Sequence, residues 1–175
     1  MHNKSSHYFF IALFAVALVI GCSSGRERPK DLPRLYPAKL TITQEGAPLE
    51  DATVTLHSTD PNFRWSVGGS TDAQGVVVLN TNGFYEGVPL GTYKIAISRV
   101  VRTGPPIPHV SELPDDEIAR ARVFAEIDRQ TRLTQVVDPL YRDANKTLLE
   151  WEVVGGKNEA TFDVGKPVDI RVPTN

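Results

Sequence analysis

The sequence predicts an all-β protein, an antiparallel β-sandwich of seven to eight strands with one helical insertion. Three observations predict this fold class. Apolar and polar residues alternate with a period of two in eight short segments of the chain. Turn sequences separate most of these segments at the spacing of about 8–12 residues that is typical of sandwiches. Strands do not alternate with helical patterns along the chain, which argues against a parallel α/β sheet.

Each expected strand places its apolar residues at every second position, so that one of its faces is buried. In residues 63–67 this parity puts Trp65 on the same face as Phe63 and Val67, which predicts a core position for Trp65. Residues 76–79 are apolar on both faces, which predicts a central strand. The expected strands are 39–43, 52–57, 63–67, 76–79, 93–98, 149–154, 160–164 and 168–172.

One long segment, residues 103–146, breaks the strand pattern and is the expected helical insertion. A helix is expected from about Asp115 to Arg132, because its first turn is acidic and acids there favour the positive end of the helix dipole. A narrow apolar stripe that includes Val123 and Ile127 is expected to pack on the edge of the sandwich. A connection of this length serves either as a cover for an open sheet edge or as a functional lid.

The N-terminal residues carry a pattern of export and lipid attachment. After Lys4, an apolar stretch of thirteen residues runs from Tyr8 to Ile20 and ends at Gly21-Cys22. The stretch is shorter than the ~20 residues that a membrane-spanning helix needs. It fits the apolar region of a signal peptide, which is about 7–15 residues long. Cys22 is the only cysteine of the chain, so it has no disulfide partner within it. An ordinary cleaved signal and a short uncleaved anchor are the alternatives.

This N-terminal pattern resembles a bacterial lipoprotein signal peptide. The resemblance implies cleavage between Gly21 and Cys22 and acylation of the Cys22 thiol, with palmitate among the acyl chains. Because two or more chains hold a protein stably in a bilayer, Cys22 would bind membrane lipid. Ser23 favours the outer membrane over the inner one. The expected location is therefore the cell envelope, lipid-anchored at the outer membrane.

The expected domain organisation follows from this reading. Residues 1–21 form the lipoprotein signal peptide, residues 22–37 a flexible tether rich in proline and charge, and residues 38–175 the sandwich domain. The net charge at pH 7 is −2, and it becomes −3 when the signal with its single Lys4 is removed. A nucleic-acid partner is not expected, because such a partner requires a basic surface.

Three motifs resemble the carboxypeptidase regulatory-like domain, whose fold is also described as transthyretin-like. They are residues 46–56, residues 70–76 with a T-D-x-x-G turn, and residues 87–93 with a P-x-G-x-Y turn. The turn chemistry predicts that Asp72 accepts a hydrogen bond from its own backbone two residues on. Tyr93 is expected to point its ring inward and its hydroxyl at a loop backbone. The lipoprotein signal, residues 65–69 before the T-D turn and the late helical insertion together also resemble small planctomycete-type lipoproteins, which mostly lack an assigned activity.

The residues that carry catalytic or metal chemistry are sparse. His57 and His109 are the histidines that remain after the signal, and zinc takes three or four ligands at defined spacing. No nucleophile elbow, phosphate-binding loop or zinc-protease motif is present in the sequence. We therefore expect no catalytic residue, no metal site, no cofactor and no enzymatic activity.

The sequence thus predicts a lipid-anchored, non-enzymatic cell-envelope protein with a structural or interaction role, whose partner is an envelope protein or a glycan. The alternative is a carbohydrate-binding module that uses Trp65, Phe84 and Tyr85. Exposure of those rings would favour it, and burial of all three would remove it. A transthyretin-like hydrolase is the third hypothesis. It requires a cleft that gathers His57 or His109 with Arg102 and an acid.

Overall fold

The computed structural model describes residues 28–172, and the chain divides into two units, residues 1–32 and residues 33–175. The expected signal peptide, with Gly21 and Cys22, lies outside the described residues. In the described part of the first unit, the Leu32 N–H donates to the Pro29 carbonyl at 3.1 Å and closes a turn. Within residues 28–172 no helix has the length and apolar character needed to cross a bilayer.

The second unit is mostly β-structure, and its several antiparallel sheets confirm the expected fold class. The elements are β1 (Ala38–Gln44), β2 (Ala47–Pro48), β3 (Thr53–Ser58), β4 (Val67–Ser70), β5 (Val76–Val78), β6 (Asn80–Thr81), β7 (Tyr85–Glu86), β8 (Gly91–Ser98), β9 (Val100–Thr103), η1 (Val110–Glu112), α1 (Glu117–Gln130), β10 (Arg132–Gln135), α2 (Pro139–Arg142), β11 (Glu150–Val153), β12 (Asn158–Asp163) and β13 (Ile170–Val172).

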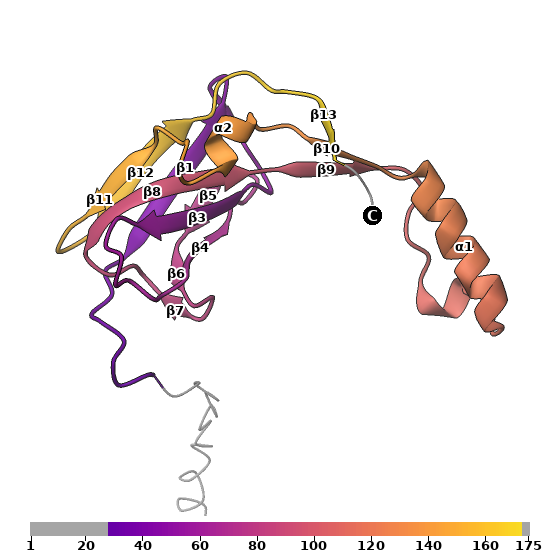
Figure 1. Cartoon of the computed structure of the whole chain (residues 1–175), viewed down its shortest axis with the longest axis horizontal. Helices are drawn as coiled ribbons and strands as arrows, with labels where there is room; N and C mark the ends of the chain where they lie inside the picture. The colour runs from indigo at the N-terminus through magenta and orange to yellow at the C-terminus, as the bar shows by residue number, and fades with distance from the viewer. Residues whose placement is uncertain (1–27, 173–175) are drawn as a thin grey trace, which may run out of the picture. The chain divides into compact units, whose positions relative to one another are not determined.

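Two sheets form the layers of the sandwich (Figure 1). In the four-stranded sheet, β1 pairs with β12 in parallel and with β2 and β5 in the antiparallel direction. The six-stranded sheet has the order β11-β8-β3-β4-β6-β7, and all of its pairs are antiparallel. The β1–β12 pair is therefore a parallel exception within the expected antiparallel fold.

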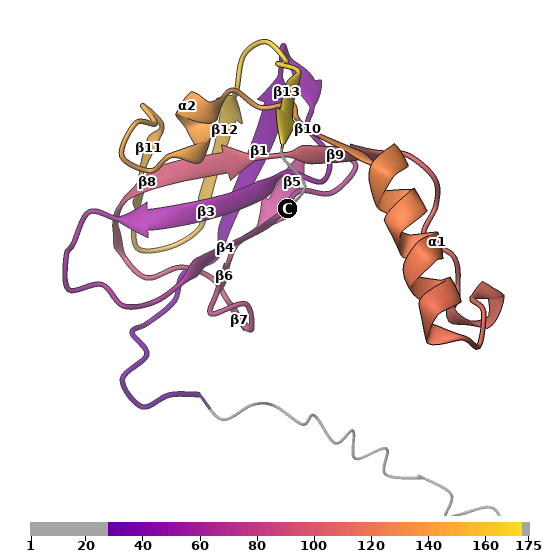
Figure 2. The same cartoon turned by 45° about the vertical axis from the view of Figure 1, so that its right-hand side comes forward.

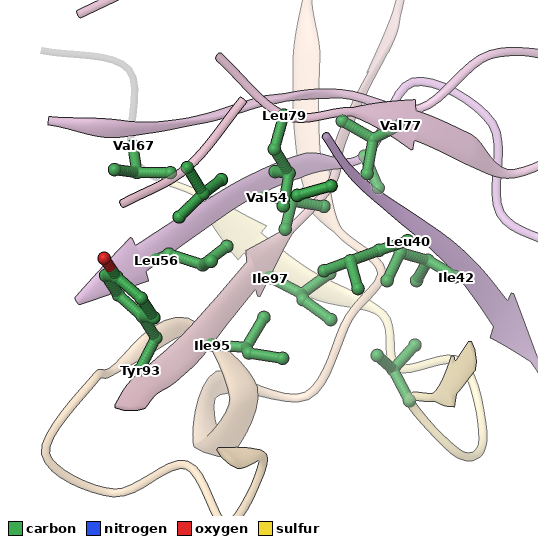
Figure 3. Packing of buried hydrophobic residues seen from close by; sticks show 14 of the residues in the cluster. Leu40, Ile42, Val54, Leu56, Val67, Val77, Leu79, Tyr93, Ile95 and Ile97 are labelled. Carbon is green, nitrogen blue, oxygen red and sulfur yellow. The ribbon is translucent and has the colours of Figure 1, made fainter. Parts of the chain in front are cut away.

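The core lies between these two sheets (Figure 3). From the four-stranded sheet come Leu40 and Ile42, and from the six-stranded sheet come Val54 and Ile97, all with no exposed surface. The alternation in the sequence explains this, because every second residue of β1, β3 and β8 points inward. Full burial of one such side chain contributes about 1.5–3 kcal/mol, so this cluster is the main source of stability.

Two turns form as their residues predict. Glu45 (φ 50°) and Gly46 (φ 79°) join β1 to β2 in the conformation that a two-residue hairpin requires. The Asp72 carboxylate accepts hydrogen bonds from the N–H groups of Gln74 and Val76, each at 2.9 Å. Gly75 (φ 72°) completes that turn, and a Cβ there would lie 2.5 Å from the Ile42 carbonyl oxygen. Glycine is thus required at this position.

Two of the strands expected in the middle of the chain differ in the structure. Residues 61–66 are irregular, and β4 begins only at Val67, because the Asp60-Pro61 turn redirects the chain. Residues 76–79 are not a central strand, so that prediction is wrong. β5 pairs with β1 alone, Val78 is 48% exposed, and after Leu79 the chain crosses to the other sheet as β6. Burial alternates along this run, because Val77 and Leu79 point into the core whereas Val78 points outward.

The larger part of the expected insertion, residues 103–146, forms an arm, a name we use for residues 100–135 with β9, η1, α1 and β10, whereas its last part, with α2, packs against β8. The helix begins after Asp116, whose carboxylate accepts from the Ala119 N–H at 2.7 Å, and it ends at Gln130. The expected packing of its apolar stripe on the sandwich edge is wrong. Ile127 is the one buried residue of α1, and the helix lies beyond the end of β9 and β10 (Figure 1, Figure 2).

A third sheet explains this placement. β9 continues the direction of β8, and β10 returns beside it in antiparallel register, with Thr103 opposite Arg132. β13 completes the sheet on the other side of β10. The sequence therefore predicted the helix of the insertion but missed β10 and the short helix α2, and it placed β13 in the sandwich.

Candidate functional site

A pocket of about 340 Å³ lies at the surface of the sandwich, within the usual size range of ligand sites. The segment before β1, the β3–β4 loop and the turn before β8 supply its walls. Aromatic, amide and charged side chains all contribute. We call it the Trp65 pocket, and its lining residues are Pro33, Arg34, Tyr36, Asp60, Asn62, Phe63, Arg64, Trp65, Pro89 and Leu90.

The β3–β4 loop is held in place by local hydrogen bonds and by one ring contact. The Asp60 carboxylate accepts from the Asn62 N–H at 2.9 Å, and the Phe63 N–H donates to the Asp60 carbonyl at 3.1 Å. The Phe63 ring meets the Tyr93 ring edge-on, with centroids 5.6 Å apart and an interplanar angle of 83°. Such aromatic pairs contribute about 0.5–1.5 kcal/mol beyond burial. The loop is therefore fixed to the core immediately before Trp65.

Tyr93 connects this loop to the opposite wall of the pocket. Its side chain is fully buried, and its hydroxyl donates to the Pro89 carbonyl at 2.9 Å. This confirms the expected inward ring and loop hydrogen bond. Burial raises the pKa of the Tyr93 hydroxyl to about 12, so the group remains a proton donor at neutral pH. Figure 3 shows the hydroxyl oxygen directed away from the aliphatic side chains of the core.

The segment before β1 forms another wall. Tyr36, which the sequence assigned to the tether, pairs with Val88 through two backbone hydrogen bonds of 2.9 and 3.0 Å. Gly87 permits this approach, because a Cβ there would lie 2.8 Å from the Tyr36 carbonyl oxygen. The Arg34 guanidinium lies 5.2 Å from the centre of the Tyr36 ring, which is a cation–π distance. Thus Arg34 and Tyr36 belong to the sandwich unit.

Trp65 is half-buried and lies outside the core cluster, so the core position predicted for it is wrong. The parity argument failed because residues 61–66 do not form a strand. The Arg64 guanidinium lies 5.5 Å from the centre of the Trp65 ring. Backbone and side-chain bonds between Ser66 and Asn82 fix the chain after it, with the Asn82 N–H donating to the Ser66 carbonyl at 2.7 Å.

Phe84 and Tyr85 lie on the β6–β7 hairpin and do not line the Trp65 pocket. Asn82 (φ 54°) and Gly83 (φ 73°) make the turn that places Phe84 at its tip, where the side chain is 65% exposed. Tyr85 is half-buried. The structure therefore combines Trp65 with Tyr36 rather than with Phe84 and Tyr85. No local signal marks Tyr36, since its partner Val88 lies far along the sequence.

The residues of the hydrolase hypothesis do not meet in one cleft. The Arg102 guanidinium donates to the Pro105 carbonyl and to the Thr131 hydroxyl, each at 2.9 Å, and therefore braces the arm. His109 caps η1 and accepts from the Ser111 N–H. His57 is exposed on the outward face of β3, as expected. Across residues 28–172 no group of three histidine, cysteine or acidic side chains could hold a metal ion.

Comparison with known proteins found no matching family model, no matching curated protein and no matching solved structure. The resemblance to the carboxypeptidase regulatory-like domain stays a prediction from three short motifs.

Proposed function

We propose that the protein is a lipid-anchored, non-enzymatic binding module of the cell envelope, attached to the outer membrane through an acylated Cys22. The observation that supports a binding role most directly is the Trp65 pocket. Its walls come from three separate parts of the chain and are held by hydrogen bonds and by the Phe63–Tyr93 contact. A site on a rigid scaffold binds with a small ordering cost.

The hydrogen bonds of two residues that a hydrolase would need, Arg102 and His109, favour a binding role over a catalytic one. The two terminal nitrogens of Arg102 and the Nδ1 atom of His109 make structural hydrogen bonds within the arm. A nucleophile within hydrogen-bond reach of an oriented base is the arrangement that catalysis by these groups requires. The His109 ring lies 2.9 Å from the Ser111 hydroxyl, but Glu112 accepts from the His109 backbone N–H at 3.0 Å, so the acid caps η1 instead of orienting the imidazole.

Labelling with a palmitate analogue tests the anchor. The wild-type protein is expected to take up the label and to sediment with membranes. The Cys22→Ala variant is expected to lose both the label and the membrane association, because the thiol that forms the thioether is gone. Retention of the unlabelled variant in the membrane fraction would contradict the proposed anchor.

A glycan is the ligand class that the Trp65 pocket favours, as the second candidate function. The apolar face of a sugar stacks on an aromatic ring, while amide and charged groups bind its hydroxyls. The pocket offers the Trp65 and Tyr36 rings together with Asp60, Asn62 and Arg34. Phe84, which is exposed but outside the pocket, provides a matched aromatic control.

Tryptophan fluorescence tests this ligand class. In a Trp151→Phe background, Trp65 is the remaining tryptophan, so short oligosaccharides can be titrated against its emission. Binding is expected to survive Phe84→Ala and to fall about fivefold or more with Tyr36→Ala, because the loss of one stacking surface costs roughly 1–3 kcal/mol. In the Trp151-containing protein, Trp65→Ala should abolish binding measured by calorimetry. Saccharide binding that depends on Phe84 but not on Trp65 would overturn the assignment.

A further inference from the structure

A second pocket, of about 600 Å³, lies where the outward face of the six-stranded sheet meets the end of α2. It is separate from the Trp65 pocket, since the two share no lining residue. We call it the Arg142 pocket, and its lining residues are His57, Ser58, Thr59, Lys94, Arg142, Asp143, Ala144 and Asn145.

Strand register places the charged residues of this pocket side by side. His57 of β3 lies directly opposite Lys94 of β8, and Lys94 lies directly opposite Glu150 of β11. Directly opposed residues of antiparallel strands share one face of the sheet. The buried neighbours Leu56 and Ile95 occupy the inner face, so the row of His57, Lys94 and Glu150 is on the outer one. α2 packs against β8 and brings the residues that follow it to this row.

The acids at the pocket are already matched by cations. The Glu150 carboxylate lies 2.7 Å from the Lys94 ammonium. Asp143 accepts from the Asn145 N–H at 2.9 Å and lies 3.5 Å from the Lys146 ammonium. The backbone N–H of Asn145, and then the charge of Lys146, hold the pKa of Asp143 below its usual value. Asp143 and Glu150 therefore carry negative charges that are compensated locally.

Arg142 and His57 are left without such partners. Within residues 28–172 neither side chain makes a hydrogen bond or an ion pair. A guanidinium presents a planar fork of N–H donors that matches the oxygens of phosphate or carboxylate. An imidazole adds a further donor, and it adds positive charge when protonated. The pocket thus combines an uncompensated cation with unused donors, which is the chemistry that recognises an anion.

We propose that the Arg142 pocket binds a phosphate group. Arg142 holds two of its oxygens, and His57 donates to a third. The volume exceeds that of a phosphate alone, so the pocket also accommodates the organic part of a phosphate ester. A divalent cation is disfavoured, because Arg142 repels it and both acids are paired with lysines.

Calorimetry on the full-length Cys22→Ala protein, which cannot be acylated, tests the proposal with defined probes in detergent-free buffer; each variant below is made in this background, which serves as the wild type. Inorganic phosphate and glycerol 3-phosphate represent a soluble ligand, and vesicles of phosphatidylglycerol, compared with phosphatidylcholine, represent a lipid headgroup. Arg142→Ala is expected to weaken binding of the phosphate probe about tenfold or more, since a charge-assisted bidentate contact is lost. Arg142→Lys should lose less, because it keeps the charge without the fork. His57→Ala should weaken binding by a smaller factor.

Arg129→Ala is the matched control, because it also removes one exposed arginine but lies on α1, paired with Glu126. It should bind every probe like the wild type. Preferential binding of the soluble esters identifies a soluble ligand, and binding of anionic vesicles alone, lost in Arg142→Ala, identifies a headgroup. Failure of the wild type to bind any phosphate probe overturns the proposal, and so does equal binding by Arg142→Ala. Neither outcome bears on saccharide binding at the Trp65 pocket.

Discussion

The sandwich buries its large apolar residues, whereas the arm leaves most of its own exposed. In the sandwich, Leu40 and Ile97 have no exposed surface, whereas in the arm Ile107, Val110 and Ile118 are 66%, 78% and 65% exposed. Free energy from burial is therefore concentrated between the two sheets, and the arm adds little to it. Both pockets lie on the sandwich. Candidate sites thus rest on the part of the molecule that resists local unfolding.

Truncation of one isoleucine in each region is the strongest way to break this comparison. Ile97→Ala is expected to lower the free energy of unfolding by about 2–5 kcal/mol, because it leaves a cavity in a packed core. Ile118→Ala should change it by less than about 0.5 kcal/mol, since that side chain is already 65% exposed. Urea denaturation measures both. Similar losses in the two variants would show that the arm helix contributes to the same core.

Tyr93→Phe sharpens the comparison inside the sandwich, because it removes a single hydroxyl from the core edge. Loss of the bond to the Pro89 carbonyl is expected to cost about 1–3 kcal/mol, the penalty for an unsatisfied buried group. The folded pKa of about 12 lies above the ordinary value of 10. The wild type should therefore keep this contribution below pH 10 and lose it as the pH rises toward 12.

Thermal melts between pH 8 and pH 11.5 measure that loss. Tyr93→Phe lacks the titrating group, so its melting temperature should fall less steeply over this range than that of the wild type. Parallel curves would contradict the proposed role of burial at Tyr93.

The sequence predicted correctly those features whose formation depends on residues close together in the chain. The strict alternation in β1, β3 and β8 and the Asp72–Gly75 turn each depend on residues close in the chain, and all form as expected. The helix was likewise predicted from its acidic start and apolar spacing, although its real bounds are Glu117–Gln130. Its packing partner could not be predicted, because periodicity identifies an apolar face but not the surface that covers it.

Neither pocket could be predicted from the sequence, because each is built from segments that are distant in the chain. Trp65 follows an apparent strand parity, yet the Asp60 turn breaks the strand before it, so the ring lies at the surface. The sequence assigned Tyr36 to the tether, because its pairing with Val88 depends on a contact between distant parts of the chain. Nothing in the sequence indicates a site at Arg142, since α2 is distant in the chain from His57 and Lys94, which line the same pocket. Sites built from separate segments are recognisable only when the fold brings them together.

Asp163 tests a surface contact of the sandwich, where a smaller effect is expected. Its carboxylate accepts from the Gly46 N–H at 2.8 Å, the Thr43 hydroxyl at 2.7 Å and the Gly165 N–H at 2.7 Å. These bonds, with that from Gly46 foremost, hold the pKa of Asp163 below its usual value. The contribution is therefore present above the ordinary carboxyl pKa and is lost as the pH falls through the lowered folded value.

Asp163→Asn should accordingly lower the melting temperature at pH 7, and the difference from the wild type should shrink as the pH falls from 5 to 2. Glu117→Gln is the control, because it removes one exposed carboxylate from the arm helix instead. A difference that stays constant with pH would contradict the role of the Asp163 charge.

Replacement of the whole arm bears most directly on the comparison, and only a small effect on stability is expected. Because Thr103 lies opposite Arg132, residues 104–131 can be replaced by Asn-Gly, which forms a two-residue hairpin between those strands. The bonds of Arg99 and Arg132 to Val136 and Asp169 lie outside the deleted part and remain. The free energy of unfolding should change by less than about 1 kcal/mol, and both pockets should bind their probes unchanged. A chain that fails to fold, or that loses either pocket, would show that the arm stabilises the sandwich through contacts other than the burial of Ile127.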